Sequence, residues 1–286
     1  MNTREWLKRR LAEGPILLAP GVFDPLSAKV VQRCGFEAVY VSGGAISRSL
    51  GFPDLGLVTM TEMLDRIAAI CEATDLPVIA DADTGYGNPL NVRRTVREWE
   101  RAGVAALHLE DQVTPKKCGH YEGKALISRE EMVQKVRAAV EARRDGVLIV
   151  ARTDARAVEG LEGALARARA YREAGADVLF VEAPQSVQEI EAIARSLPGP
   201  LMINIFAGGK TPVVPARELD RLGYRLAIYP GELQRAALHA MLACARHLRE
   251  TGTVDGFAQV VSFQEREVLV DADRWASLEA RYATGG

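Results

Sequence analysis

The chain has 286 residues, of which 48% are hydrophobic and 26% charged, and its formal net charge at pH 7 is -2. This length suffices for one large domain with a substantial core, and the balanced charge argues against nucleic acid as a partner. No apolar run approaches the roughly 20 residues of a transmembrane helix, and no signal sequence is recognisable. We therefore expect one cytoplasmic domain over residues 1–286, without a membrane partner.

Short β-rich apolar runs alternate with longer amphipathic stretches up to about residue 250, a pattern typical of repeated βα units. The runs lie at residues 16–19, 38–42, 78–81, 106–110, 147–152, 178–182, 201–205 and 226–229. Eight repeats favour closure into a (β/α)8 barrel of the TIM type over an open doubly wound sheet. Helices are expected between the runs, including residues 60–73, 90–102, 129–142, 160–174 and 231–250.

Two connections, residues 43–59 and 111–128, are longer than ordinary βα loops, so we expect irregular segments with a functional role there. After the last barrel helix, residues 252–256 predict a turn, and a final helical tail is expected over about residues 262–282. We interpret residues 252–286 as a helical extension of the barrel, since no linker argues for a second domain.

Acidic side chains end two neighbouring strands, where a βα barrel carries its functional residues. Asp81 and Asp83 are two residues apart and so leave the strand on the same side, and Glu110 ends the next strand. A single Asp here would more simply cap the following helix. Three carboxylates at one barrel mouth repel unless a cation joins them, and oxygen ligands without His or Cys predict Mg²⁺, with Mn²⁺ possible.

Two features of the strand ends point to an anionic ligand. Gly43 and Gly44 follow a strand, where the backbone could bind a carboxylate, although tight turns use such a pair equally. Arg152 ends the fifth strand, and a buried guanidinium requires an anion. That anion is either a substrate or an internal partner, Asp154 or Glu182.

Cys118 differs in its surroundings from the three other cysteines, which lie in helix-like apolar stretches. It lies within the cationic segment KKCGHYEGK at residues 116–124. This positive charge is expected to lower the thiol pKa from about 8.5 towards neutrality, which would make Cys118 a usable acid or base. From the residues alone, a solvated basic loop with an incidental thiol is nearly as good an interpretation.

Taken together, the motifs resemble the isocitrate lyase/phosphoenolpyruvate mutase superfamily over nearly the whole barrel. The resemblance is carried by Gly21-Val22-Phe23-Asp24, Tyr40-Val41-Ser42-Gly43-Gly44, Asp81-Ala82-Asp83-Thr84-Gly85-Tyr86-Gly87, Leu109-Glu110-Asp111-Gln112, Lys117-Cys118-Gly119-His120, Ala151-Arg152-Thr153-Asp154, Asn204 and Tyr229-Pro230. The Lys-Cys-Gly-His segment marks the lyase branch, because the phosphonate-forming mutases and oxaloacetate decarboxylases of the superfamily lack this cysteine loop.

The resemblance implies a magnesium-dependent carbon–carbon bond lyase with the following roles. Substrate would contact Ser42, Gly43, Gly44, Asp81, Gly119, Arg152, Glu182, Asn204 and Arg235. Magnesium would be held by Asp81 and Asp83, directly or through water, with Glu110 in the outer shell. Tyr40 is the candidate base for the 2-hydroxyl proton. Cys118 would protonate the departing carbanion, stabilised by Lys117, His120 and Arg235.

The substrate is less sharply indicated. Residues 40–50 and 151–161 resemble 2-methylisocitrate lyase, whereas residues 118–124, 204–212 and 262–265 resemble the dimethylmalate lyase, oxaloacetate hydrolase and petal-death branch. We expect a 2-methylisocitrate-like or 2,3-dimethylmalate-like acid to be cleaved to pyruvate and a second acid. Oxaloacetate acetylhydrolase is the alternative, and a phosphonomutase or a non-catalytic barrel is less favoured. The resemblance also implies a homotetramer that exchanges the segment after Gly231 between subunits.

Overall fold

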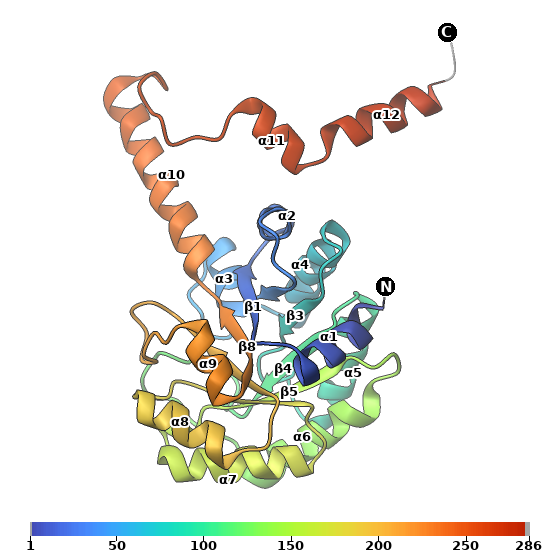
Figure 1. Ribbon diagram of the computed structural model, residues 1–286, viewed down its shortest axis with the longest axis vertical. Helices are drawn as coiled ribbons and strands as arrows, with labels where there is room; N and C mark the ends of the chain where they lie inside the picture. The colour runs from blue at the N-terminus through green and yellow to red at the C-terminus, as the bar shows by residue number, and fades with distance from the viewer. Residues whose placement is uncertain (1, 284–286) are drawn as a thin grey trace.

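A closed barrel of eight parallel strands forms the centre of the computed structural model, which describes residues 2–283 (Figure 1). The strands are β1 (Leu17–Val22), β2 (Val39–Val41), β3 (Val78–Asp81), β4 (Ala106–Glu110), β5 (Leu148–Thr153), β6 (Val178–Val181), β7 (Leu201–Asn204) and β8 (Tyr224–Tyr229). Each strand pairs with the next, and β8 pairs in parallel with β1. The predicted (β/α)8 barrel is therefore confirmed.

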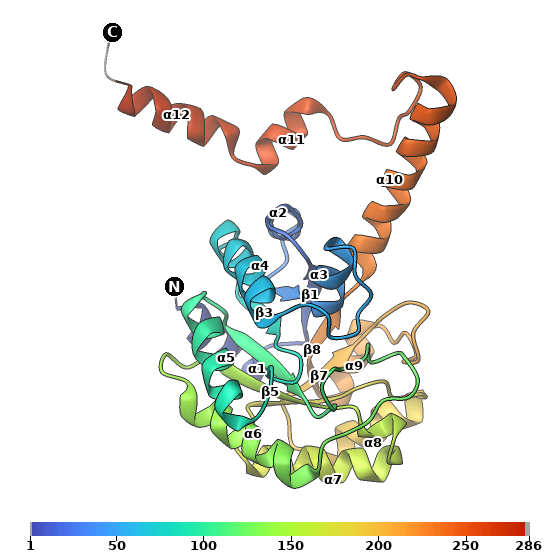
Figure 2. The same cartoon turned by 180° about the vertical axis from the view of Figure 1, so that it is seen from behind.

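Helices alternate with the strands, and most of them cover the outside of the barrel (Figures 1 and 2). They are α1 (Thr3–Glu13), α2 (Pro25–Arg33), α3 (Gly43–Ser49), α4 (Met60–Ala73), α5 (Pro89–Arg101), α6 (Arg129–Ala142), the 3-10 turn η1 (Ala155–Ala157), α7 (Gly160–Glu173), α8 (Val187–Ser196), α9 (Ala216–Leu222) and α10 (Glu232–Thr251). The five helices named from the sequence correspond to α4, α5, α6, α7 and α10, with ends shifted by one residue at most.

Buried apolar side chains form two layers, one between strands and outer helices and one inside the barrel. The inner layer includes Ile79, Val150 and Phe180, together with Leu7 and Leu11 of α1. The helix α1 therefore closes the N-terminal end of the barrel. Because that end is filled by apolar side chains, a ligand can enter only from the opposite end, where the strands carry their polar residues.

The segment 43–59 is more regular than the sequence indicated, because its first part folds into α3. Ser42 caps this helix, its Oγ accepting a hydrogen bond from the Ala45 amide at 3.2 Å. The Gly43-Gly44 pair has low helix propensity and concealed the helix in the sequence. One consequence is that Arg48, in the last turn of α3, lies next to the barrel mouth.

The C-terminal part of the chain leaves the barrel. The long helix α10 projects outward, and residues 252–283 form an arm with α11 (Phe263–Leu269) and α12 (Ala272–Tyr282), as Figures 1 and 2 show. The helical tail predicted over residues 262–282 is divided into these two helices, because Asp271 has a left-handed backbone with φ of 56°. The last three residues of the predicted extension, 284–286, lie outside the described residues.

No helix of the described residues is both long and apolar enough to cross a bilayer.

Trp99 of α5 supports the strand end that carries Asp81. Its side chain is fully buried, and its indole Nε1 donates a hydrogen bond to the Asp81 carbonyl at 3.1 Å. We expect Trp99→Ala to lower the free energy of unfolding by about 4 kcal/mol through the cavity it leaves. Trp99→Phe keeps most of the ring and should cost about 1–2 kcal/mol, mainly from the lost hydrogen bond. Urea unfolding measures both, and equal losses would contradict this packing role.

Candidate active site

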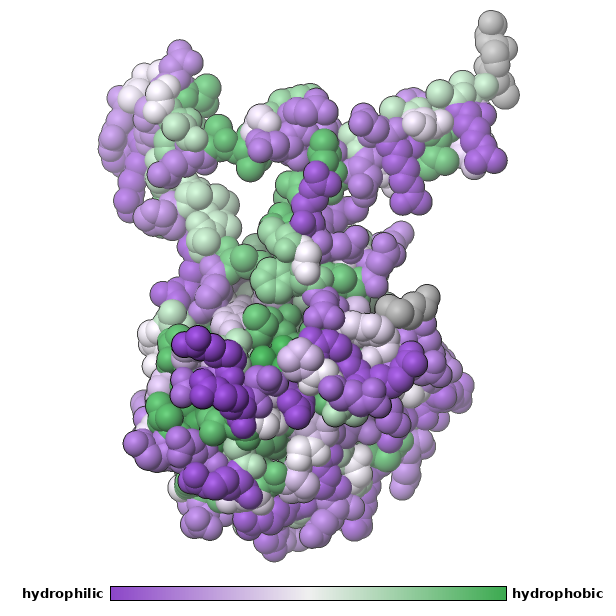
Figure 3. All heavy atoms as spheres, in the orientation of Figure 1, coloured by the Kyte–Doolittle hydropathy of each residue, from purple (hydrophilic) through white to green (hydrophobic). Residues whose placement is uncertain are grey.

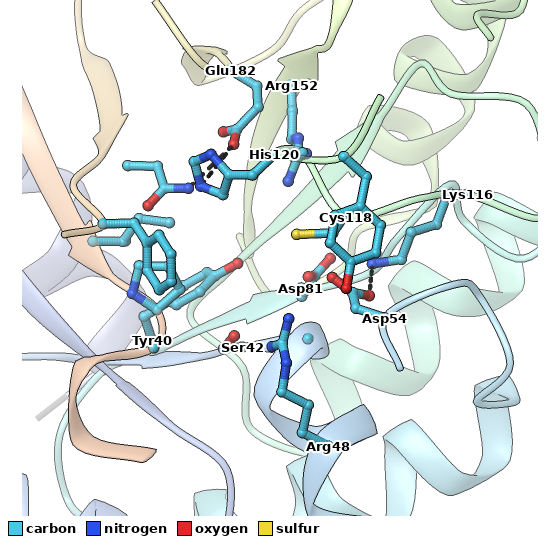
Figure 4. Close-up of a pocket in the computed structure, with 18 residues that line it drawn as sticks. Tyr40, Ser42, Arg48, Asp54, Asp81, Lys116, Cys118, His120, Arg152 and Glu182 are labelled. Atoms are coloured by element: carbon cyan, nitrogen blue, oxygen red, sulfur yellow. Dashed lines mark hydrogen bonds and ion pairs between the residues drawn. The ribbon is translucent and has the colours of Figure 1, made fainter. Parts of the chain in front are cut away.

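A cavity of about 250 Å³ lies at the C-terminal end of the barrel strands (Figure 4). Ten residues predicted from the sequence line it: Tyr40, Ser42, Gly44, Asp81, Cys118, Gly119, His120, Arg152, Glu182 and Asn204. Further lining side chains that sequence reasoning did not assign to the site are Arg48, Asp54, Lys116, Tyr121 and Phe206. The structure thus brings groups from β2, β3, β5, β6 and β7 together with the cysteine loop, residues 116–124, around a space suited to a small organic acid.

Five other predicted residues lie outside this lining, namely Gly43, Asp83, Glu110, Lys117 and Arg235. The Lys117 ammonium donates to the Gly123 carbonyl at 2.9 Å and so is held within the cysteine loop. The Arg235 guanidinium donates to the Ala207 carbonyl at 2.7 Å and lies over the Phe206 ring. Neither cation reaches the cavity in this conformation, so the structure does not support their predicted contact with a departing carbanion.

Lys116, rather than Lys117, is the lysine inside the site. Its Nζ lies 2.5 Å from Asp54 Oδ1 and 2.9 Å from Asp83 Oδ1. Burial disfavours the charge of Lys116, yet Asp83 and Asp54 together raise the pKa of its ammonium well above the ordinary value. Lys116 is therefore a permanent cation between two carboxylates. Asp54 escaped sequence analysis because it lies in the connection after α3, with no spacing that relates it to a strand end.

The three acids predicted to hold magnesium do not gather around one point. Among residues 2–283, no group of three or more His, Cys, Asp or Glu side chains is placed to hold a metal ion. Two cations draw the acids apart, since Asp83 pairs with Lys116 and Glu110 Oε2 lies 3.3 Å from Arg152 Nε. A compact three-carboxylate cluster is thus not formed in this conformation, and binding of magnesium by Asp81 and Asp83, directly or through water, with Glu110 in the outer shell stays a prediction.

The same acids nevertheless retain the features of a cation site. Both Glu110 oxygens are buried and make no hydrogen bond with the described residues, and Asp83 Oδ1 has only the Lys116 ammonium beside it, 2.9 Å away. Burial, with repulsion from Asp81 and Asp54, raises the Asp83 pKa to about 6 despite Lys116. Burial also raises the pKa of Glu110 well above its usual range, although Arg152 opposes this. These residues fit a hard divalent cation, which would satisfy free carboxylate oxygens in a negatively charged pocket.

Arg152 is held by an internal ion pair. Its Nε and Nη2 donate to Asp154 at 2.9 and 3.1 Å. Burial opposes its charge, but Asp154, Glu110 and Glu182 raise the Arg152 pKa further. Of the two interpretations that the sequence left open, the internal partner is therefore present, and it is Asp154. The guanidinium still lines the cavity, so the ion pair fixes its orientation towards a ligand (Figure 4).

The cysteine loop is anchored at both ends. At its start, the Gln112 side chain brackets the Lys117 peptide, accepting from the amide at 3.0 Å and donating to the carbonyl at 2.8 Å. At its end, the Lys124 ammonium binds the Gly119 carbonyl at 2.6 Å and Asp154 at 2.8 Å. Between these anchors, a Cβ on Gly119 would overlap Glu182 and Arg152. The loop is thus closed over the cavity, and only glycine fits at its closest approach.

The thiol of Cys118 does not have the lowered pKa that the sequence predicted. Burial, together with the charges of Asp54 and Glu182, raises the Cys118 pKa above its ordinary value. The prediction failed because the neighbouring lysines are already neutralised, Lys116 by Asp54 and Lys124 by Asp154. Cys118 is therefore a protonated thiol at neutral pH. It can donate a proton to a ligand but is poorly suited to accept one.

Tyr40 forms a buried pair with His108, a residue that sequence analysis did not single out. The Tyr40 hydroxyl lies 2.7 Å from His108 Nε2. Burial lowers the His108 pKa to about 3, so the imidazole is neutral. Burial and the Asp81 charge raise the Tyr40 pKa well above its usual value, so the phenol is protonated. His108 sits inside strand β4, where the sequence gives no signal that distinguishes it from a packed core histidine.

His120, Glu182 and Asn204 form the wall opposite α3 (Figure 4). Asn204 Nδ2 donates to Glu182 Oε1 at 3.2 Å, and His120 Nε2 lies 3.9 Å from the same oxygen. The His120 ring stacks on Phe206 with centroids 5.2 Å apart. Burial lowers the His120 pKa although Glu182 opposes it. This wall offers a carboxylate, an amide and an imidazole to a ligand in the cavity.

A (β/α)8 barrel whose strand ends surround a polar cavity has the architecture of an enzyme. The family described as phosphoenolpyruvate phosphomutase matches residues 7–249. The chain is 46% identical over 288 residues to 2,3-dimethylmalate lyase of Eubacterium barkeri, with all of both chains covered. It is 51% identical over 247 residues to 2-methylisocitrate lyase of Aeropyrum pernix, which covers 86% of this chain and 80% of the relative.

Solved structures agree with these relatives. A crystal structure of 2,3-dimethylmalate lyase matches with a TM-score of 0.93 and 37% identity, covering 98% of this chain and 95% of the other. The structure of oxaloacetate acetylhydrolase with 3,3-difluorooxalacetate matches with a TM-score of 0.93 and 33% identity, covering 100% of this chain and 99% of the other. The structure of phosphonopyruvate hydrolase complexed with oxalate and Mg++ matches with a TM-score of 0.89 and 31% identity, covering 99% of each chain. The chain belongs to the phosphoenolpyruvate mutase/isocitrate lyase superfamily, as its motifs predicted.

The raised pKa of Cys118 generates a direct test. Because only a small fraction of the Cys118 thiol is ionised near neutral pH, it should react with iodoacetamide more slowly than a free thiol. The rate of this reaction should increase at alkaline pH. Peptide mapping by mass spectrometry measures the rate at this residue, and Cys118→Ser identifies its peptide. Rapid labelling at neutral pH, with a flat pH dependence, would show the thiolate that the sequence predicted.

Proposed function

We propose that this protein is a carbon–carbon bond lyase that cleaves a substituted 2-hydroxy di- or tricarboxylate to pyruvate and a second carboxylic acid. The observation that carries the proposal is the protonated thiol of Cys118, held over the same small cavity that Ser42, Gly44 and Arg152 line. A positioned acid above the ligand is what cleavage of a carbon–carbon bond requires, because the carbanion left behind must receive a proton. Relatives named 2,3-dimethylmalate lyase and 2-methylisocitrate lyase support the substrate class.

Magnesium is the metal that we propose for this site, with Mn²⁺ as a possible substitute. Asp81 and Asp83 would hold it, partly through water, with Glu110 behind them, since both Glu110 oxygens are buried without a hydrogen bond and all three carboxylates lie at neighbouring strand ends. When bound, the ion would bind the 2-hydroxyl and carboxylate of the substrate and acidify the hydroxyl. The complex of phosphonopyruvate hydrolase with Mg++ supports this choice.

The side chains divide the remaining work. Ser42, Gly43 and Gly44 bind the carboxylate of the half that becomes pyruvate, and Arg152 orients the same half. Tyr40 takes the hydroxyl proton only as it passes its own proton to His108, 2.7 Å away, because the phenol is protonated at rest. The electrons of the C2–C3 bond move to the departing carbon.

The departing carbon then receives its proton from the Cys118 thiol, which becomes a thiolate. His120 and Asn204 contact this second half and spread its negative charge. The closed cysteine loop excludes bulk water, which would otherwise compete as proton donor. The proton lost by the hydroxyl stays on the Tyr40–His108 pair until products leave, so the overall proton count is unchanged.

Oxaloacetate acetylhydrolase is the second candidate function. The match to that enzyme over the whole chain favours it. In that reaction water attacks the keto carbon and the leaving carbon is again protonated, so the same thiol would serve. The two activities differ in product, since hydrolysis of oxaloacetate releases acetate and oxalate without forming pyruvate.

The test is turnover of 2-methylisocitrate, 2,3-dimethylmalate, isocitrate and oxaloacetate in magnesium buffer, with detection of pyruvate, glyoxylate and acetate. We expect pyruvate from one of the first two acids. Cys118→Ser should lower kcat by about 10²–10⁴-fold, the usual contribution of a general acid, with pyruvate binding by calorimetry nearly unchanged. Unfolding of this variant would show a structural thiol instead. Absence of turnover of all four acids by the wild-type protein would refute the proposal.

We also propose that the chain assembles as a homotetramer in which neighbouring subunits exchange the segment after Gly231. No side chain of α11 or α12 is buried, and Gln234 is the buried residue of α10. Large apolar side chains are exposed there instead, including Met241 at 58%, Phe263 at 70% and Trp275 at 67%. Figure 3 shows hydrophobic residues on the surface of this projecting part of the chain, among hydrophilic ones. Exposed apolar groups of this extent are typical of a protein interface, and a second copy of the chain is the occupant we propose.

Sedimentation velocity tests this assembly. The wild-type protein should sediment as a tetramer, and Trp275→Glu should shift it to smaller species because a charge replaces a buried ring in the interface. Ser277→Glu adds the same charge on another face of α12 and serves as the control. A monomeric wild-type protein, or equal behaviour of both variants, contradicts the proposal.

A further inference from the structure

Arg48 is a cavity residue for which the family motifs provide no role. It lies in the last turn of α3, and its guanidinium extends into the cavity on the side away from Glu182 and Arg152 (Figure 4). The residue is exposed to solvent. It therefore lies at the entrance of the site, where it can meet a ligand without displacing any other side chain.

Arg48 differs from the other permanent cations of the cavity in making no hydrogen bond or ion pair with the described residues, although its charge helps to lower the pKa of the nearby Asp54. Lys116 is paired with Asp54 and Asp83, and Arg152 with Asp154 and Glu110. Within residues 2–283, the Arg48 guanidinium makes no hydrogen bond and no ion pair. A guanidinium directed into a cavity with all its donors free is suited to a carboxylate of the ligand.

The position of Arg48 indicates which half of the ligand it meets. A Cβ on Gly44 would lie 3.0 Å from Arg48 Nη1 and 2.8 Å from Asp54 Oδ2, so both groups extend over Gly44. A carboxylate near Ser42 and Gly44 would face the negative charges of Asp54 and Asp81. The nearby Lys116 is already neutralised, so Arg48 is in place to offset the repulsion from Asp54, beside any cation held at Asp81.

We infer that Arg48 is a substrate-binding residue that pairs with the carboxylate of the half released as the 2-oxo acid. The inference rests on the proposed function for the identity of that half, which contacts Ser42 and Gly44. Arg48 provides affinity and orientation, and it takes no part in proton transfer, because an arginine stays protonated throughout. The site thereby requires a 2-hydroxy acid whose first carboxylate is ionised.

The experiment compares pyruvate with pyruvamide, which replaces the carboxylate by a neutral amide. Calorimetry in magnesium buffer should show that Arg48→Gln weakens pyruvate binding about ten- to hundredfold, the loss expected for a charge-assisted hydrogen bond. Pyruvamide binding should change little. Arg48→Lys should recover part of the pyruvate affinity, because it restores the charge but not the planar fork. In turnover, KM should rise with kcat nearly unchanged.

Arg195→Gln is the matched control, since this exposed arginine lies on α8, outside the cavity. Equal binding of pyruvate by wild-type and Arg48→Gln protein overturns the inference, as does an equal loss for pyruvate and pyruvamide. Failure of the wild-type protein to bind pyruvate overturns it too. An effect confined to tricarboxylates would place Arg48 at another carboxylate and also contradict it. Failure of the proposed lyase function gives a different result. In that case the wild-type protein turns over none of the acids, while Arg48→Gln still weakens its binding of pyruvate.

Discussion

Excess negative charge at the mouth of the barrel is the constraint on which this site depends. Asp81, Asp83, Glu110, Asp154 and Glu182 are all buried at adjacent strand ends. Carboxylates in such numbers are stable in a buried site only with cations beside them. Two of these cations come from the ends of the cysteine loop, Lys116 and Lys124, so compensation of the strand-end charge also pins the loop. The electrostatics of the barrel thus determine where Cys118 stands.

This coupling explains why the chemistry of the thiol differs from what its neighbours in sequence indicate. The loop has three lysines, and a sequence-based argument adds their charges to the surroundings of Cys118. In the fold, Lys116 and Lys124 are neutralised and Lys117 binds a backbone carbonyl. The remaining influences on the thiol are burial and nearby carboxylates, which favour its protonated form. A cationic segment can therefore hold an acid, provided that its cations are already paired.

The sequence predicted the barrel well because strand and helix patterns depend on local periodicity and on Gly at helix ends. It found Asp81, Cys118, Arg152, Glu182 and Asn204 because each ends a strand or lies in a distinctive motif. It missed Asp54, Arg48 and His108 for physical reasons. Asp54 lies in a loop, whose path to the site cannot be read from residue spacing. Arg48 lies in a helix whose two glycines hid it in the sequence, and His108 lies in the interior of a strand among apolar neighbours.

The Tyr40–His108 pair ties the proton chemistry to the same charge balance. In this conformation burial holds the Tyr40 phenol protonated and the His108 imidazole neutral. Transfer of the phenolic proton to the imidazole is therefore unfavourable at rest, because burial disfavours both of the charged forms that it would create. Asp81 contributes directly, because its carboxylate adds to the raised pKa of Tyr40. Positive charge brought to Asp81 would therefore ease loss of the phenolic proton. The acids that fit a divalent cation and the candidate base are thus linked through one carboxylate, and the base step depends on how Asp81 is neutralised.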